Sequence, residues 1–183
     1  MTVRQIVFTD NPVLRQKSRR VPQVTREVER LIADMFETMH QAGGVGLAAV
    51  QVGVPLRVIV VEIPEDMDDP DAGVSLAMIN PEFIRTVGEK EEGTEGCLSV
   101  PGWAGKVPRY PEVVVKWLGP DGKAARRRAR GYLARVLQHE IDHTNGVLFI
   151  DLATEVWSVE EGQEETAEME DAERRGAAER LQE

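Results

Sequence analysis

Apolar residues recur at steps of three and four in the first third of the chain, which is the spacing of one helix face. Thr25 precedes this pattern as a candidate N-cap, and Gly43-Gly44 follows it as a stop. We therefore predict an amphipathic helix between these points, with its apolar stripe facing the core. The stripe consists of Val28, Leu31, Ile32, Met35, Phe36 and Met39.

The middle of the chain alternates between β-branched runs and turn-forming residues, which is typical of short strands. The predicted strands are residues 57–63, 77–80, 83–87, 113–117 and 123–130. Residues 64–73 are expected to be a surface loop, and residues 89–95 a charged connection. A second helix is predicted over residues 131–143, ended by Asn145-Gly146. Its inner side would be formed by Leu133, Val136, Leu137 and Ile141.

The chain has 183 residues, enough for one domain with a substantial core. Its net charge of −10 is uneven, because residues 155–183 hold eleven acids against three arginines. That segment carries −8 and leaves −2 for residues 1–154. We therefore expect one folded domain over residues 1–154 and an acidic tail over residues 155–183, either helical or disordered. This negative net charge argues against specific nucleic-acid binding.

A single cysteine, Cys97, excludes an internal disulfide and favours a reducing compartment, which for this chain would be the cytoplasm. The apolar runs, such as residues 58–61, are far too short to span a bilayer. The first residues lack the apolar core of a secretory signal. We expect no membrane contact.

Residues 139–143 read His-Glu-x-x-His and lie on the second predicted helix. Residues at i and i+4 share a helix face, so His139 and His143 can reach one divalent metal ion. Glu140 is turned by about 100° from His139 around the helix, where it can address a metal-bound water without binding the metal. In such sites the glutamate serves as general base.

A catalytic metal centre usually has three protein ligands and one open position, so the pattern lacks one ligand. Cys97, within Glu95-Gly96-Cys97-Leu98-Ser99, is the candidate, although a lone cysteine is more often a small buried apolar residue. The third histidine of the chain, His40, ends the first predicted helix. One thiolate and two imidazoles suit zinc and iron(II) about equally.

Residues 44–51 are rich in glycine and alanine, so another backbone can approach them closely. Their Gly-x-Gly lacks the third glycine and the preceding strand of a dinucleotide site, and on its own it indicates only a helix cap and turn. Gln51 ends this segment and could donate an amide hydrogen bond to a reacting carbonyl.

Taken together and in this order, the three motifs closely resemble those of peptide deformylase, and the resemblance extends from about Val13 to Asp151. It implies an α+β fold in which mixed or antiparallel sheets pack around a central helix that carries the two histidines. It implies an enzyme that removes the N-terminal formyl group from formyl-methionyl nascent polypeptides and releases formate. It also implies one divalent metal, with iron(II) as the native ion and nickel, cobalt or zinc as substitutes.

The same resemblance assigns roles within the site. Glu140 would take a proton from metal-bound water as that water attacks the formyl carbon, and would then protonate the leaving amine. The Gln51 amide and the Leu98 backbone N–H would hold the oxyanion. The metal ligands would be Cys97, His139 and His143.

For the substrate, the resemblance implies strand addition, in which the main chain gives affinity and a pocket gives specificity. The substrate strand would pair near Val45, Gly46 and Gly96. The methionine side chain would enter a pocket lined by Val136 and its neighbours. Arg135 stands where many relatives carry an apolar residue, and we expect it to offer its aliphatic stem. Residues 102–104, Gly-Trp-Ala, stand where some relatives place an arginine.

Contact with the ribosome is a further expectation. Some deformylases dock on the ribosome through a basic C-terminal helix, whereas residues 155–183 here are acidic. A transient contact would therefore use the basic run at residues 123–130, for which a solvated sheet edge is the simpler interpretation.

Two other functions fit part of the sequence. A zinc endopeptidase shares His-Glu-x-x-His, but it needs a third histidine or an acid as ligand, and no histidine follows His143. A metal-stabilised binding module needs four protein ligands and has no use for Glu140.

Overall fold

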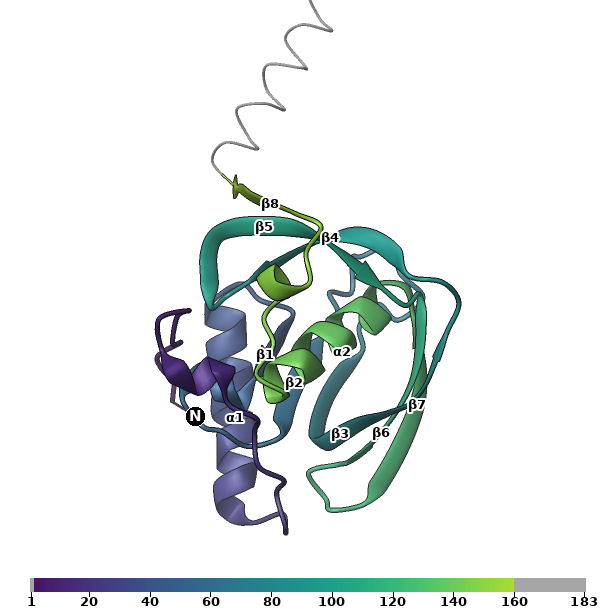
Figure 1. The fold of residues 1–183 in the computed structure, drawn as a ribbon. Coiled ribbons are helices and arrows are strands. Elements are labelled where there is room, and N and C mark those ends of the chain that lie inside the picture. Colours follow the sequence, from purple (N-terminus) through teal and green to yellow (C-terminus); the bar gives the residue numbers. More distant parts are fainter. Residues whose placement is uncertain (1, 160–183) are drawn as a thin grey trace, which may run out of the picture.

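The computed structural model describes residues 2–159. Two helices and eight strands follow one another along this part of the chain (Figure 1). The helices are α1 (Arg26–Gln41) and α2 (Gly131–Thr144). The first strands are β1 (Gly46–Ala48), β2 (Val58–Glu62), β3 (Ser75–Val87) and β4 (Glu91–Cys97). The later strands are β5 (Val100–Arg109), β6 (Glu112–Leu118), β7 (Ala124–Arg130) and β8 (Glu155–Ser158). Short 3-10 turns are η1 (Pro12–Arg15), η2 (Ala49–Val52) and η3 (Phe149–Asp151).

The strands form two antiparallel sheets. Five strands pair in the order β1-β2-β3-β6-β7, and three pair in the order β4-β5-β8. Helix α2 lies between the two sheets (Figure 1). The predicted α+β fold around a central histidine-bearing helix is thus confirmed.

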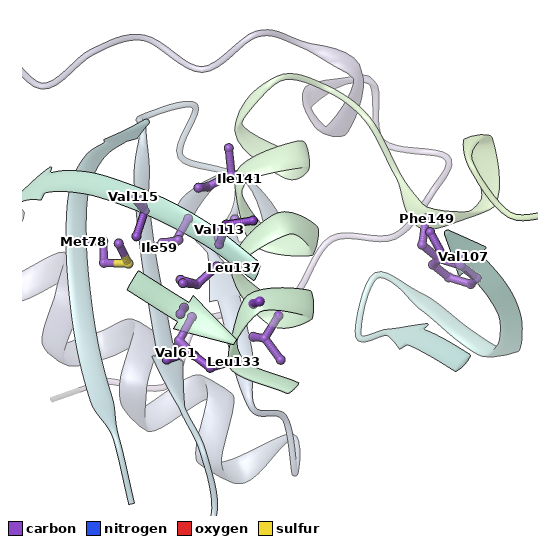
Figure 2. Packing of buried hydrophobic residues seen from close by; sticks show 14 of the residues in the cluster. Ile59, Val61, Met78, Val107, Val113, Val115, Leu133, Leu137, Ile141 and Phe149 are labelled. Atoms are coloured by element: carbon purple, nitrogen blue, oxygen red, sulfur yellow. The ribbon is translucent and has the colours of Figure 1, made fainter. Parts of the chain in front are cut away.

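The main core joins α2 to the inner face of the five-stranded sheet. Figure 2 shows Leu133, Leu137 and Ile141 of α2 facing apolar side chains of β2, β3 and β6. The sheet side chains in this view are Ile59, Val61, Met78, Val113 and Val115. Val107 and Phe149 close the core beside the second sheet. Full burial of each such side chain contributes about 1.5–3 kcal/mol, so this packing fixes how α2 is oriented.

Helix α1 packs on the opposite face of the five-stranded sheet, over β1 and β2. Met35 and Met39 are fully buried there, beside Leu47 and Val60. The predicted apolar stripe is therefore confirmed as core, with Phe36 only partly buried at its margin. Thr25 precedes the helix as predicted, although its side chain makes no capping hydrogen bond to the backbone.

Two expectations about strands were wrong. Residues 89–95 are not a plain connection, because residues 91–97 form β4 and pair with β5 along their length. The side chains of Glu91 and Glu92 are exposed and that of Glu95 is buried, while the backbone pairs with β5. The two short strands expected around Pro81 are one strand, β3, with a break in register between Ile79 and Glu82. Asn80 takes a left-handed conformation at this break, with φ of 54°.

The structured region continues beyond residue 154. The first four residues of the predicted tail form β8, which pairs with residues 103–106 of β5. Val159 follows β8, and residues 160–183 lie outside the described residues, so their helical or disordered state stays a prediction. Among the described residues, no helix is long and apolar enough to cross a membrane.

Candidate metal centre

The structure brings together the three residues predicted to bind metal. Cys97 ends β4, while His139 and His143 lie one turn apart on α2. Their ligand atoms all lie within 4.8 Å of one another. The Cys97 Sγ lies 3.3 Å from the His143 Nε2, which lies 3.1 Å from the His139 Nε2. One sulfur and two imidazole nitrogens thus converge on a single point.

Glu95 orients His139 from the opposite side of its ring. The Glu95 Oε2 lies 2.9 Å from the His139 Nδ1, which leaves Nε2 facing the cluster. Arg109 holds the same carboxylate through two hydrogen bonds, of 2.9 and 3.0 Å, and also pairs with Asp142. Burial disfavours the charged form of Glu95, but the bonds from His139 and Arg109 outweigh it and lower its pKa to about 2. Glu95 is therefore ionised at neutral pH.

The sequence motif contained Glu95 without revealing its role. Glu95 and Cys97 stand two apart on β4, and such residues point to the same side of a strand. That spacing was the one indication that Glu95 would lie beside the cluster. Arg109 had no comparable indication, because its partners lie 14 and 33 residues away in the chain.

The electrostatics of the cluster fit a bound cation. Burial lowers the pKa of His143 well below its usual value, so this imidazole is neutral and has a lone pair to offer. Burial opposes charge on His139 as well, yet hydrogen bonds to Cys97 and Glu95 raise its pKa to about 10. A site that favours a proton this strongly also favours a metal ion in its place. The residues present therefore fit a divalent metal.

Glu140 lies buried beside the cluster on α2. Burial raises its pKa to about 7, so its carboxyl can both accept and release a proton near neutral pH. Its Oε2 has no hydrogen-bond partner among the described residues. A Cβ on Gly46 would clash with this carboxylate, so only glycine lets β1 pass so close to α2.

Gln51 reaches the cluster from η2. The Ala48 N–H donates to the Gln51 Oε1 at 2.8 Å, which fixes the amide with its nitrogen toward β4. That nitrogen lies 3.2 Å from the Ser99 Oγ and 3.5 Å from the Cys97 Sγ. The segment predicted as a cap and turn is in fact the short strand β1 followed by η2, and this turn is what buries Gln51.

A cavity of about 400 Å³ opens beside these groups. Its lining includes the predicted catalytic residues Gln51, Leu98 and Glu140, together with the ligand candidates Cys97 and His139. The predicted substrate-binding residues also line it: Val45, Gly46, Gly96 and Val136. The lining also includes Tyr132, which the sequence did not indicate, and Trp103, from the Gly-Trp-Ala segment noted in the sequence.

Arg135 lines the cavity as well, and both terminal nitrogens of its guanidinium donate hydrogen bonds. It donates to Glu95 at 2.9 Å and to three backbone carbonyls, those of Glu91, Gly93 and Val107. These bonds tie α2 to β4 and β5. Its charged end is thus bound to these strands, and the contribution of its aliphatic stem to the methionine pocket stays a prediction.

Comparison with known proteins agrees with this geometry. Residues 3–157 match the polypeptide deformylase family over their whole length. The chain belongs to the peptide deformylase family. It is therefore an enzyme, a hydrolase that acts in protein biosynthesis.

Individual deformylases resemble the chain over most of its length. The peptide deformylase of Thermomicrobium roseum is 48% identical over 172 residues, covering 92% of this chain and 97% of the relative. That of Halothermothrix orenii is 52% identical over 151 residues, covering 82% of this chain and 94% of the relative. Both cover nearly the whole relative, so the match is to complete deformylases.

Solved structures show the same fold. Peptide deformylase from Ehrlichia chaffeensis in complex with actinonin has a TM-score of 0.80 and 41% identity, covering 84% of this chain and 90% of that one. The Thermotoga maritima enzyme has a TM-score of 0.78 and 36% identity, covering 84% and 99%. Deformylases are metal-dependent, and within residues 2–159 the group that could hold the ion is Cys97, His139 and His143.

Proposed function

We propose that the chain removes the N-terminal formyl group from formyl-methionyl nascent polypeptides and releases formate. The observation that carries this proposal is the buried carboxylate of Glu140, placed beside three convergent metal-ligand atoms at the end of a cavity. A structural metal site would have no use for such a carboxylate. Three protein ligands would leave room for water at the ion, as hydrolysis requires.

Cys97, His139 and His143 would hold one divalent ion. Bound there, the ion would supply Lewis acidity, polarising the formyl group and lowering the pKa of water toward 7. Glu140 accepts the proton that water loses as the water oxygen attacks the formyl carbon. Glu140 then gives a proton to the amine nitrogen as the C–N bond breaks, which yields formate and a free methionyl amine. Its pKa of about 7 suits both transfers.

The oxygen of the formyl group gains negative charge during this attack. We assign its stabilisation to the Gln51 amide and the Leu98 backbone N–H. Gln51 Nε2 contacts only a neutral hydroxyl and the Cys97 sulfur among described residues, so an oxyanion would be a stronger acceptor. A donor aimed at developing charge is worth about 3 kcal/mol, or a factor of about 10² in rate.

The substrate would bind as an extended strand near Val45, Gly46 and Gly96. Strand β4 is an edge of its sheet, because β5 pairs with only one of its sides. Its free side therefore offers backbone donors and acceptors to a peptide. Val136 lines the cavity from α2, and we place the methionine side chain against it.

Iron(II) is the ion we propose, with nickel, cobalt or zinc as substitutes. The donor set of one sulfur and two imidazoles accommodates all of them, so the donors alone do not select one. Metal analysis of protein prepared without oxygen, together with formate release from a formyl-Met peptide, tests both metal and activity. Iron with activity supports the proposal, whereas metal-loaded protein that releases no formate contradicts it.

A transient ribosome contact is assigned to the basic run at residues 123–130. Helix α1 packs mainly over β1 and β2 on the outer sheet face, and Arg126 and Arg128 are exposed on β7. The run has five basic residues, which pair with three acids among the described residues, Asp71, Glu112 and Asp121, so it keeps excess positive charge. Phosphate groups would be attracted to this face.

A further inference from the structure

Helix α2 begins without a capping side chain of its own. Its N-cap residue, Arg130, makes no side-chain hydrogen bond to the first turn, and that turn contains no acidic residue. The first N–H groups of a helix have no partner inside the helix, so they need acceptors from elsewhere. The Gly131 N–H donates to the Pro111 carbonyl at 3.1 Å. The Tyr132 N–H is the next donor along the helix that needs an acceptor.

That acceptor is Asp69, which lies 63 residues earlier in the chain, in the loop between β2 and β3. The Asp69 Oδ2 accepts from the Tyr132 N–H at 3.1 Å. A Cβ on Gly131 would lie 3.0 Å from the same oxygen, and Gly131 has a φ of 53°. Glycine at this position therefore lets the carboxylate approach the helix end. The helix dipole favours a negative charge there.

The loop holds the Asp69 carboxylate in this orientation. The Asp71 N–H donates to the second oxygen, Oδ1, at 2.9 Å, and the Ala72 N–H donates to the Asp69 carbonyl at 3.0 Å. Met67 packs against the main core, and Asp71 forms an ion pair with Arg127 of β7. Both Asp69 oxygens thus accept a backbone N–H, and the loop is attached to the fold on either side of Asp69.

The turn that Asp69 caps carries part of the cavity wall. Tyr132 and Val136 are four residues apart, so they share a face of α2, and both line the cavity. The candidate metal ligands on α2 begin at His139, about two turns beyond Tyr132. A helix frays from its end, so loss of the cap would free Tyr132 before it frees His139 or Glu140.

We propose that Asp69 is a positioning residue for the pocket that receives the methionine side chain, acting through the Tyr132 N–H on the first turn of α2. This role rests on the proposed deformylase function, whereas the cap itself does not. Tyr132 would contact the methionine side chain away from the reacting carbon, equally in the ground state and the transition state. Displacement of Tyr132 therefore raises KM and leaves kcat unchanged.

The activity test uses metal-loaded full-length enzyme with formyl-Met-Ala-Ser and formyl-Ala-Ala-Ser. Asp69→Ala should raise KM for the formyl-Met peptide by about fivefold at unchanged kcat, the factor to which loss of a typical N-cap corresponds. KM for the formyl-Ala peptide should stay within about twofold of the wild type, because a methyl group offers the pocket wall little contact. Asp69→Asn keeps an acceptor oxygen and should restore most of the affinity for the formyl-Met peptide.

Asp68→Ala is the matched control, because Asp68 is the neighbouring acid on the same loop and its side chain is exposed. It should behave as the wild type with both peptides. Should Asp69→Ala not fold, Asp69→Ser takes its place, and KM for the formyl-Met peptide should rise by at least about twofold. Wild-type KM in the folded variant, or a rise in KM that is equal for both peptides, overturns the proposal.

Amide hydrogen exchange tests the cap without measuring activity. In the Asp69→Ala variant loaded with zinc, the Tyr132 N–H should exchange at least about tenfold faster than in the wild type, at an unchanged rate for the Glu140 N–H. Unchanged exchange at Tyr132 overturns the cap and with it the positioning role. A wild type that releases formate from neither peptide would instead overturn the proposed function, while the exchange rates would still decide whether Asp69 holds the first turn.

Discussion

The carboxylate of Glu95 lies 2.9 Å from the Nδ1 of His139, on the side of the ring away from the ligand cluster. Arg109 and Arg135 hold that carboxylate in turn, each within hydrogen-bond distance. The ring of a candidate metal ligand is therefore oriented by a buried ion network that spans β4, β5 and α2. Such partners fix which nitrogen is free to bind and raise its basicity.

Glu95→Gln should weaken metal binding by about 10- to 100-fold, because the amide gives His139 a weaker and less oriented acceptor. The measurement is competition with a chelator of known affinity, using purified metal-free protein. Glu92→Gln is the control, since Glu92 lies on the same strand with its side chain exposed. Unchanged metal affinity in Glu95→Gln would show that the network only supports the fold.

Glu95 should also affect acid stability in the metal-free protein. Its pKa is depressed to about 2 in the folded state, so its charge stabilises the fold above its unfolded pKa. That contribution, on the order of 3 kcal/mol, is lost as pH falls from about 4.5 toward 2. Wild type and Glu95→Gln should therefore differ in unfolding free energy at pH 6 and converge toward pH 2. A difference independent of pH in urea titrations would contradict this.

Cys97→Ala should leave much less than one metal ion per chain. The thiolate is one of only three ligand atoms in the described cluster, and two imidazoles alone bind divalent metals weakly. Metal content after gel filtration gives the answer, with circular dichroism to show that the variant is folded. Full occupancy in the folded variant would remove Cys97 from the site.

Removing residues 160–183 should leave activity on short formyl-Met peptides unchanged and should not weaken ribosome binding. This cut keeps β8, whereas a cut after Thr154 would remove the strand that supports Trp103. The acidic segment would be repelled by phosphates, while Arg126 and Arg128 would attract them. Co-sedimentation with ribosomes at low and moderate salt tests this. Binding that disappears with the segment would indicate a protein partner on the ribosome rather than RNA.

The helices could be predicted because each presents a continuous apolar stripe to a core. The apolar stripe from Val28 to Met39 is buried in one core cluster, and the inner side of α2 is buried in the other. Burial of these faces determines how each helix is oriented. Strand β4 could not be predicted, since residues 91–94 are polar and their pairing depends on β5, which is rich in proline and glycine. Periodicity is uninformative when backbone pairing rather than side-chain burial forms the strand.

The candidate site was predictable to the extent that its residues sit in contiguous motifs. The structure brings together the ligand atoms of Cys97, His139 and His143, as expected. Gln51 lines the adjacent cavity. Arg109 was not predicted, and the hydrogen bond from Arg135 to Glu95 was not predicted either, because both arise only from tertiary contacts. Residues 102–104 were noted in the sequence, but the position of Trp103 in the cavity lining depends on a break in the pairing of β5 with β4 and on pairing with β8.

The central claim is that Glu140 moves the proton in formyl hydrolysis and does not hold the metal. Glu140→Ala, loaded with metal without oxygen, should contain as much metal as the wild type. Its rate of formate release from formyl-Met-Ala-Ser should fall by at least about 10², within the range for general acid–base groups. Near-normal formate release by that metal-loaded variant would contradict the account.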